Sequence, residues 1–204
     1  MNEIVVPIIK GNIHYDEKYV KVKKKDCYDL NAIDNKTKFI LAHLFVDKRT
    51  KINCIKFLKE IKNTCYKQIL EIYKKEKQKK KYKKLIEFTC DKFANYKNAF
   101  NKLFSKTCKL NFGVPIACKK YNLKHNNNPI ERYNGKIKDR IKNIRSGFKN
   151  FEDTKNFMNL RRIMHNYVNP HQELQGKTPA EEAEIKINLG RNKLLNLIKF
   201  VRNN

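Results

Sequence analysis

Three acidic residues stand where strands and a helix could bring their side chains together: Asp16, Asp91 and Glu131. Asp16 lies in an alternating segment rich in Tyr and Val, which is typical of a strand, and Asp91 directly follows another short strand-like segment. Glu131 falls in the first turn of a predicted helix. Carboxylates hold the divalent cations that phosphodiester hydrolysis and transfer require. Acids at strand and helix ends are also commonly caps or ion-pair partners, so both interpretations stay open.

The segment that contains Glu131 predicts an amphipathic helix with a basic face. Asn128 is a favourable N-cap, and Pro129 suits the first helical position. Steps of three and four from Glu131 place one set on a single face: Asn134, Gly135, Lys138, Lys142, Arg145 and Lys149. The opposite stripe is apolar and should pack on a core: Ile130, Ile137, Ile141, Ile144 and Phe148. This pattern suits a helix that holds a phosphodiester against an acid, although an ordinary solvated face shows it too.

The composition indicates a folded protein with a polyanionic partner. The chain has 47 Lys and Arg against 20 Asp and Glu, a net charge of +27. Nucleic acid is the commonest partner for such a charge, while a general bias toward Lys, Asn and Ile is the simpler alternative. A hydrophobic content of 40%, with 12 Phe and 10 Tyr, argues for a real core. Neither a membrane-length apolar run nor a signal peptide is present, so we expect a soluble protein of the cytoplasm.

The cysteines and histidines predict no metal or disulfide framework. The six cysteines form no CxxC pair and lie within apolar runs, which is typical of reduced, buried thiols: Cys27, Cys54, Cys65, Cys90, Cys108 and Cys118. His165 and His171 make no zinc-binding pattern with them.

Hydrophobic periodicity predicts an α/β protein. Strands are expected at 13–22, 27–33, 39–46, 85–90 and 110–116, and helices at 54–72, 93–104 and from 128 onward. The lysine-rich stretch 74–84 is interpreted as a solvated linker or a non-specific phosphate contact. Helical stripes continue to Tyr167, a break follows at Asn169 and Pro170, and another helix begins near Pro179. We expect a mixed five-stranded sheet flanked by helices over residues 1–150, and a helical C-terminal extension over 151–204.

Four segments, in chain order, resemble the DDE transposases of bacterial and archaeal insertion sequences. The first aspartate lies in YDEKYVKV, followed by DLNAID, and the second lies in TCDK. The glutamate lies in HNNNPIERYNGKIK, and HQELQGKTPAEEA is similar to the segment after the catalytic helix. These segments cover most of residues 12–183, and 40 positions separate Asp91 from Glu131, an interval of the length found in this family.

The resemblance implies an RNase H-like, integrase-like catalytic core that performs DNA transposition. Asp16, Asp91 and Glu131 would be both catalytic residues and ligands of two Mg²⁺ or Mn²⁺ ions. A metal-activated water would nick the transposon end, and the freed 3′-hydroxyl would attack target DNA. The partners would be transposon and target DNA, with a homo-oligomer assembled on them, and the protein would be nucleoid-associated.

Two neighbouring acids compete with this assignment. Glu17 should face away from Asp16, because adjacent strand residues point to opposite faces, and only one of the two should join a given cluster. Asp34 falls in a predicted turn. Both are interpreted as structural.

The predicted DNA contacts are four cations: Lys92, Lys138, Lys142 and Arg145. His125 is interpreted as a loop-orienting or capping residue that could also touch DNA. Only 15 residues precede Asp16, so the N-terminal DNA-binding module usual in this family is expected to be missing. Three alternatives to transposition stay open. One is an inactive or truncated remnant that only binds DNA, and another is an RNase H-like nuclease that cuts without joining ends. The third is a structural RNA-binding protein, which would give no reason for the three acids to converge.

Overall fold

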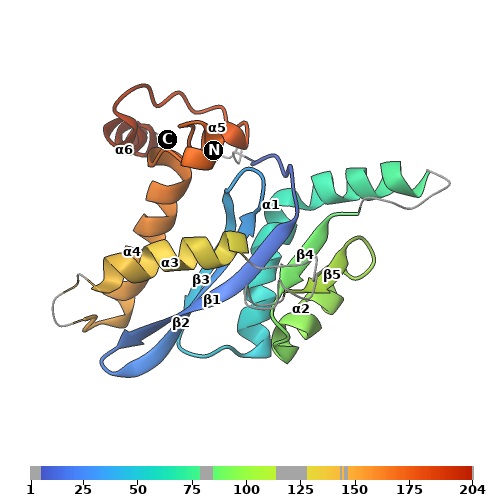
Figure 1. Ribbon diagram of the computed structural model, residues 1–204, viewed down its shortest axis with the longest axis horizontal. Helices are drawn as coiled ribbons and strands as arrows, with labels where there is room; N and C mark the ends of the chain where they lie inside the picture. Colours follow the sequence, from blue (N-terminus) through green and yellow to red (C-terminus); the bar gives the residue numbers. More distant parts are fainter. Residues whose placement is uncertain (1–5, 79–84, 114–127, 143, 145–146, 204) are drawn as a thin grey trace, which may run out of the picture.

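The computed structural model describes residues 6–78, 85–113, 128–142, 144 and 147–203. Its centre is a five-stranded sheet with the strand order β3-β2-β1-β4-β5 (Figure 1). The strands are β1 (Ile13–Val22), β2 (Lys25–Asp34), β3 (Ile40–Val46), β4 (Glu87–Cys90) and β5 (Lys109–Phe112). The first three form an antiparallel meander, while β4 pairs parallel with β1 and β5 parallel with β4. The predicted mixed five-stranded sheet is therefore confirmed.

Helices cover both faces of this sheet. The helices α1 (Lys51–Lys77) and α2 (Ala94–Phe104) pack on one face, in a cluster where the Tyr15 ring lies 5.0 Å from that of Tyr96 and 6.2 Å from that of Phe88. The helices α3 (Asn128–Lys142) and α4 (Phe151–Ile163) cover the other face, and α3 crosses the strands of the meander (Figure 1). Apolar residues of β1 alternate between the two clusters because strand side chains alternate between faces.

Several element boundaries differ from those predicted. The strand β2 begins at Lys25, because Lys23 and Lys24 alone form the turn, with φ angles of 48° and 65°. Such left-handed pairs match the twist of a two-residue hairpin. The helix α1 continues to Lys77, since Lys and Glu are good helix formers, so the first part of the lysine-rich stretch is helical. The strand β5 ends at Phe112, and residues 114–116 lie outside the described residues.

The segment after α4 is tied to the sheet through its first turn. The helix α4 continues as a π-helical turn, η2 (Met164–Val168), and ends at Asn169 before Pro170, as the sequence predicts. The side-chain amide of Asn166 in η2 pairs with both backbone groups of Ile40, at 2.9 and 3.1 Å. The last elements are η3 (Gln172–Leu174), α5 (Pro179–Glu182) and α6 (Lys193–Asn203). The domain division at residue 150 stays a prediction.

The described cysteines match their predicted environment. Cys27, Cys54, Cys65, Cys90 and Cys108 are buried with free thiols, and Cys118 lies outside the described residues. Burial raises the thiol pKa of Cys54, Cys65 and Cys90 to about 12, so these groups stay protonated and unreactive at neutral pH. In the described part of the chain, none of the helices is both long and apolar enough to span a bilayer.

The buried ring of His165 predicts an acid-sensitive fold. Burial, together with the nearby cations Lys136 and Arg161 and the His171 ring, lowers its pKa to about 4. The hydrogen bond that its Nε2–H donates to the Lys38 carbonyl, at 2.8 Å, opposes this shift. The unfolded chain binds this proton near pH 6.5, so stability should fall as pH drops from about 6.5 to 4, by about 3 kcal/mol. Urea unfolding of the wild type and His165→Gln across this range measures the effect. The Gln amide can still donate to Lys38, and an unchanged pH dependence in the variant would contradict the assignment.

Candidate active site

The first two predicted acids lie side by side at the junction of β1 and β4. These strands pair in parallel with His14 opposite Thr89, and continuing this register places Asp16 beside Asp91, the residue that follows β4. The crevice beyond the carboxyl end of a parallel strand is where open α/β sheets hold their ligands. Asp91 is fixed in this place because its Oδ1 accepts the backbone N–H of Phe93 at 3.0 Å, just before α2 begins.

A third carboxylate completes a cluster there, and it is Glu17. One ligand oxygen from each of Asp16, Glu17 and Asp91 lies within 4.8 Å of the others, so this group could hold a metal ion. The prediction that Glu17 would be kept from this cluster is therefore wrong. The backbone alternation itself holds, but Asp91 lies beyond the end of β4, and the carboxylates of Asp16 and Glu17 reach it from opposite faces of β1.

Two side chains hold Glu17 in its buried position. Its Oε2 accepts the Tyr96 hydroxyl hydrogen bond at 2.8 Å, and its Oε1 forms an ion pair with Arg49. Arg49 lies over aromatic rings, 4.3 Å from the centre of Phe93 and 4.9 Å from that of Tyr28. Burial raises the Glu17 pKa, while Tyr96 and Arg49 oppose that rise. Glu17 is thus a partly neutralised acid, locked against α2.

Asp16 carries the unbalanced charge of the cluster. Burial, together with the nearby carboxylates of Glu17, Asp91 and Glu131, raises its pKa to about 7. Like charges that crowd a half-buried acid favour its protonated form. A divalent cation would relieve this repulsion, so the electrostatics of Asp16 suit a metal ligand.

Glu131 approaches the cluster from α3. It occupies the first turn of that helix, as predicted, and lies near enough to Asp16 to raise its pKa. It stands outside the three-acid group whose ligand oxygens all lie within 4.8 Å. The predicted apolar stripe positions the helix: Ile130 and Ile137 are buried against β1, β2 and β3, and Ile141 packs at the edge of the same cluster. The structure thus brings the three predicted acids into one region, with Glu131 at its margin.

A family comparison decides the identity of this region. Residues 11–171, which include all three predicted acids, match the family model of a transposase DDE domain. The chain belongs to the DDE transposase family. None of the curated proteins matches the chain by sequence.

Solved structures agree with the fold of this DDE domain. A chain of the simian T-cell lymphotropic virus intasome, solved with the PP2A regulatory subunit B56 gamma, matches with a TM-score of 0.51 and 12% identity over 93% of the DDE protein. The DDE protein spans 59% of that intasome chain. The magnesium-bound catalytic core of HTLV-2 integrase matches with a TM-score of 0.47 and 17% identity, over 86% and 97% of the two chains. The catalytic domain of Mos1 mariner transposase matches with a TM-score of 0.43 and 12% identity, over 78% of the DDE protein and 71% of the Mos1 chain. The strand order of the sheet and the match to the intasome chain together confirm the predicted RNase H-like fold.

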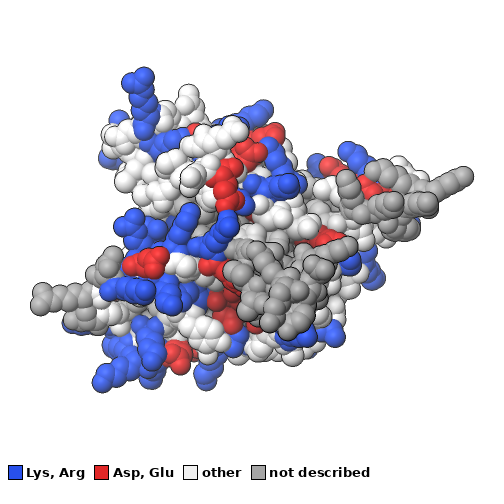
Figure 2. All heavy atoms as spheres, viewed as in Figure 1, with Lys and Arg blue, Asp and Glu red and all other residues white. Residues whose placement is uncertain are grey.

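Three of the four predicted DNA-contacting cations lie on the exposed surface of the DDE domain. Lys92 follows Asp91 directly, and Lys138 and Lys142 project from α3. Lys138 also lowers the pKa of Lys18 on β1, after the larger effect of burial, so the two cations face one another. Figure 2 shows Lys and Arg crowding the surface over α3 beside a small group of acidic side chains. Arg145 and His125 lie outside the described residues.

Several residues of the site give no signal in the sequence. Arg49 follows β3 in a polar turn, and Tyr96 resembles any other apolar residue on the buried face of α2. Asn134 was expected on the basic face, yet it is only 7% exposed, and its amide lies 3.5 Å from the Glu17 carbonyl. Its neighbour Tyr133 is also buried against the sheet. The steric fit of α3 against β1, rather than residue spacing, brings these groups together.

Proposed function

We propose that this DDE domain cleaves DNA and transfers strands at a metal site formed by Asp16, Asp91 and Glu131. The observation that carries the proposal is the convergence of acids from separate elements at the β1–β4 junction, with Asp16 under the charge of all its acidic neighbours. A cluster of acids on a protein of net charge +27 suits a phosphodiester substrate bound through metal ions.

The donor set fits magnesium or manganese. Carboxylate oxygens are the ligands these hard cations prefer, and none of the three acids is committed to an ion pair among the described residues. We propose that two ions bind there, and when bound they would supply Lewis-acid activation and neutralise charge on the phosphate.

The surrounding residues have supporting roles in this proposal. Glu17 positions β1 against α2 through its hydrogen bond with Tyr96, and Arg49 balances the negative charge of Glu17 through an ion pair. Asp91 is oriented by the backbone of Phe93. Lys92, Lys138, Lys142 and Arg145 would bind the phosphates on either side of the reacting one, which orients the strand without reading its sequence.

The test is an assay that separates cutting from joining. Purified protein is incubated with labelled transposon-end DNA and a target plasmid, with Mg²⁺, with Mn²⁺ or with EDTA. We expect metal-dependent nicking and joined products. Nicking without joining supports a nuclease instead, and metal-independent DNA binding without either product supports a remnant that only binds DNA.

DNA affinity should depend steeply on salt. Four phosphate contacts predict that log K falls with log [salt] with a slope of about −3.6 on duplex DNA. Replacing either Lys138 or Lys142 with Gln should make this slope shallower by about 1, without changing the sequence preference of DNA binding. Fluorescence anisotropy between 50 and 200 mM salt measures the slope, and a flat response would contradict the basic-face assignment.

The wider biological setting follows from the same proposal. Transposition joins two DNA ends to a target, so we expect a homo-oligomer of the chain on DNA. We also expect the protein at the nucleoid, where its substrate lies. Sedimentation with and without transposon-end DNA measures the first expectation, and a monomeric complex would contradict it.

A further inference from the structure

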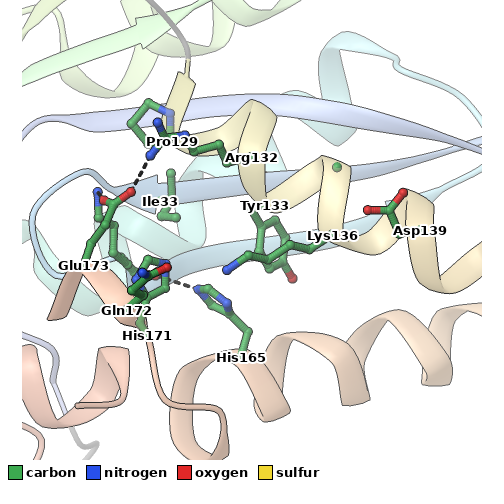
Figure 3. Close-up of a pocket in the computed structure, with 12 residues that line it drawn as sticks. Ile33, Pro129, Arg132, Tyr133, Lys136, Asp139, His165, His171, Gln172 and Glu173 are labelled. Atoms are coloured by element: carbon green, nitrogen blue, oxygen red, sulfur yellow. Dashed lines mark hydrogen bonds and ion pairs between the residues drawn. The ribbon is translucent and has the colours of Figure 1, made fainter. Parts of the chain in front are cut away.

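A separate pocket lies on the side of α3 away from the acid cluster. It has a volume of about 380 Å³ and is enclosed by α3 on one side and by η2 and residues 171–173 on the other (Figure 3). A smaller pocket of about 50 Å³ shares Tyr133, Lys136, His165 and His171 with it and adds Arg161. The smaller one is therefore an inner extension of the larger, open one.

Buried polar atoms without partners line the inner pocket. Among the described residues, the Tyr133 hydroxyl, the Arg161 Nε and the His171 Nδ1 are buried and have no hydrogen-bond partner. Tyr133 is only 4% exposed, and its ring lies 4.8 Å from that of His165, which lies 6.2 Å from that of His171. A buried donor without a partner costs about 1–3 kcal/mol, so a ligand that pairs with these groups would recover that energy.

The charge around the pocket favours an anion. Lys136 directs its amino group toward His165 and His171 (Figure 3). Among the described residues, neither Lys136 nor Arg161 forms an ion pair. The carboxylates nearby already have partners. Glu173 pairs with Lys38 at 2.7 Å and also with Arg132, and Asp139 lies 3.9 Å from Lys142.

We propose that this pocket binds a phosphate group, with Lys136 and Arg161 supplying the charge and Tyr133 and His171 supplying hydrogen bonds. Phosphate offers several acceptor oxygens, which matches donors that converge from three elements. Arg161 is half-buried, whereas Lys136 lies on the exposed rim of the pocket, so an uncharged ligand would leave the half-buried guanidinium without a counter-charge.

A DNA phosphate is the favoured source, and this part of the proposal rests on the proposed function. Glu131 and Arg132 are neighbours on α3, so the acid cluster and the pocket lie on two sides of one helix whose diameter is about 10 Å. A strand held at the acids would thus have a neighbouring phosphate within reach of Lys136. Binding of free phosphate is independent of the proposed function.

The test follows the histidine ring signals by NMR while inorganic phosphate is added at constant ionic strength without divalent metal. We expect the His171 signals, assigned with His171→Gln, to shift and saturate. Affinity should fall about fivefold to tenfold in Lys136→Gln and about threefold in Tyr133→Phe, which removes only the hydroxyl. Lys199→Gln, which removes an exposed cation from α6, is the matched control and should bind as the wild type does.

Two results would overturn the proposed phosphate-binding site. One is the absence of a saturable shift, which would mean that water alone fills the pocket. The other is equal affinity in Lys136→Gln and the control. A second titration uses a short DNA duplex in EDTA. A shift at His171 that Lys136→Gln weakens supports a DNA phosphate, whereas phosphate binding without a DNA effect overturns the DNA source alone. Loss of cleavage in the proposed active site alters none of these outcomes.

Discussion

Asp16→Asn, Asp91→Asn and Glu131→Gln should each lower DNA cleavage by about 10³-fold or more while the protein stays folded. Removing one member of a catalytic unit commonly costs this much, because the remaining groups cannot act without it. In the metal-free protein, Asp16→Asn should be at least as heat-stable as the wild type, since it removes a charge that its acidic neighbours oppose. The variants should also lose the rise in Tm that Mg²⁺ gives the wild type. Cleavage assays and thermal melts with and without Mg²⁺ measure both effects.

Glu17→Gln is the informative comparison for this series. The structure places Glu17, rather than Glu131, in the tight acidic group, but Tyr96 and Arg49 already engage both of its oxygens. We therefore expect Glu17→Gln to weaken stability more than it weakens metal binding. The opposite pattern, in which Glu17→Gln abolishes cleavage and Glu131→Gln does not, would replace Glu131 by Glu17 as the third ligand.

Asp34→Ala should destabilise the fold by about 3–5 kcal/mol without touching the acid cluster. Asp34 ends β2 and is fully buried. Its two oxygens accept four backbone N–H groups: those of Lys10 at 2.7 Å, Gly11 at 3.2 Å, Lys36 at 2.7 Å and Thr37 at 3.2 Å. A hydrogen bond to a charged group contributes about 1.5–3 kcal/mol, and the four are not additive. The Tm should fall by roughly 6–20 °C for a chain of this size.

The matched control for Asp34 is Asp26→Ala on the same strand. Asp26 is exposed near the start of β2, so its removal should change the free energy of unfolding by less than about 0.5 kcal/mol. Urea unfolding measures both variants. Equal stabilities of Asp34→Ala and Asp26→Ala would contradict the structural role that both the sequence and the structure give to Asp34.

Local patterns in the sequence were sufficient for the elements of this protein. The alternation of 13–22, the three-four spacing of α1 and α2, and the Asn128-Pro129 start of α3 each depend on neighbours along the chain, so each is readable without the fold. The buried place of Ile130 and Ile137, and the exposure of Lys138 and Lys142, follow from helical periodicity in the same way. The segments around Asp16, Asp91 and Glu131 also identified the family.

The tertiary structure alone decided which acids meet. Alternation along β1 predicts that Asp16 and Glu17 point to opposite faces, and the structure agrees. Alternation carries no information about Asp91, which lies beyond the end of the adjacent strand and is reached by both carboxylates. No local pattern predicts the ion pair between Arg49 and Glu17 either. Nor does one predict the pocket between α3 and η2, because the residues that these two helices contribute lie about 30 positions apart in sequence. Contacts between distant segments depend on strand register and helix packing, which no local pattern encodes.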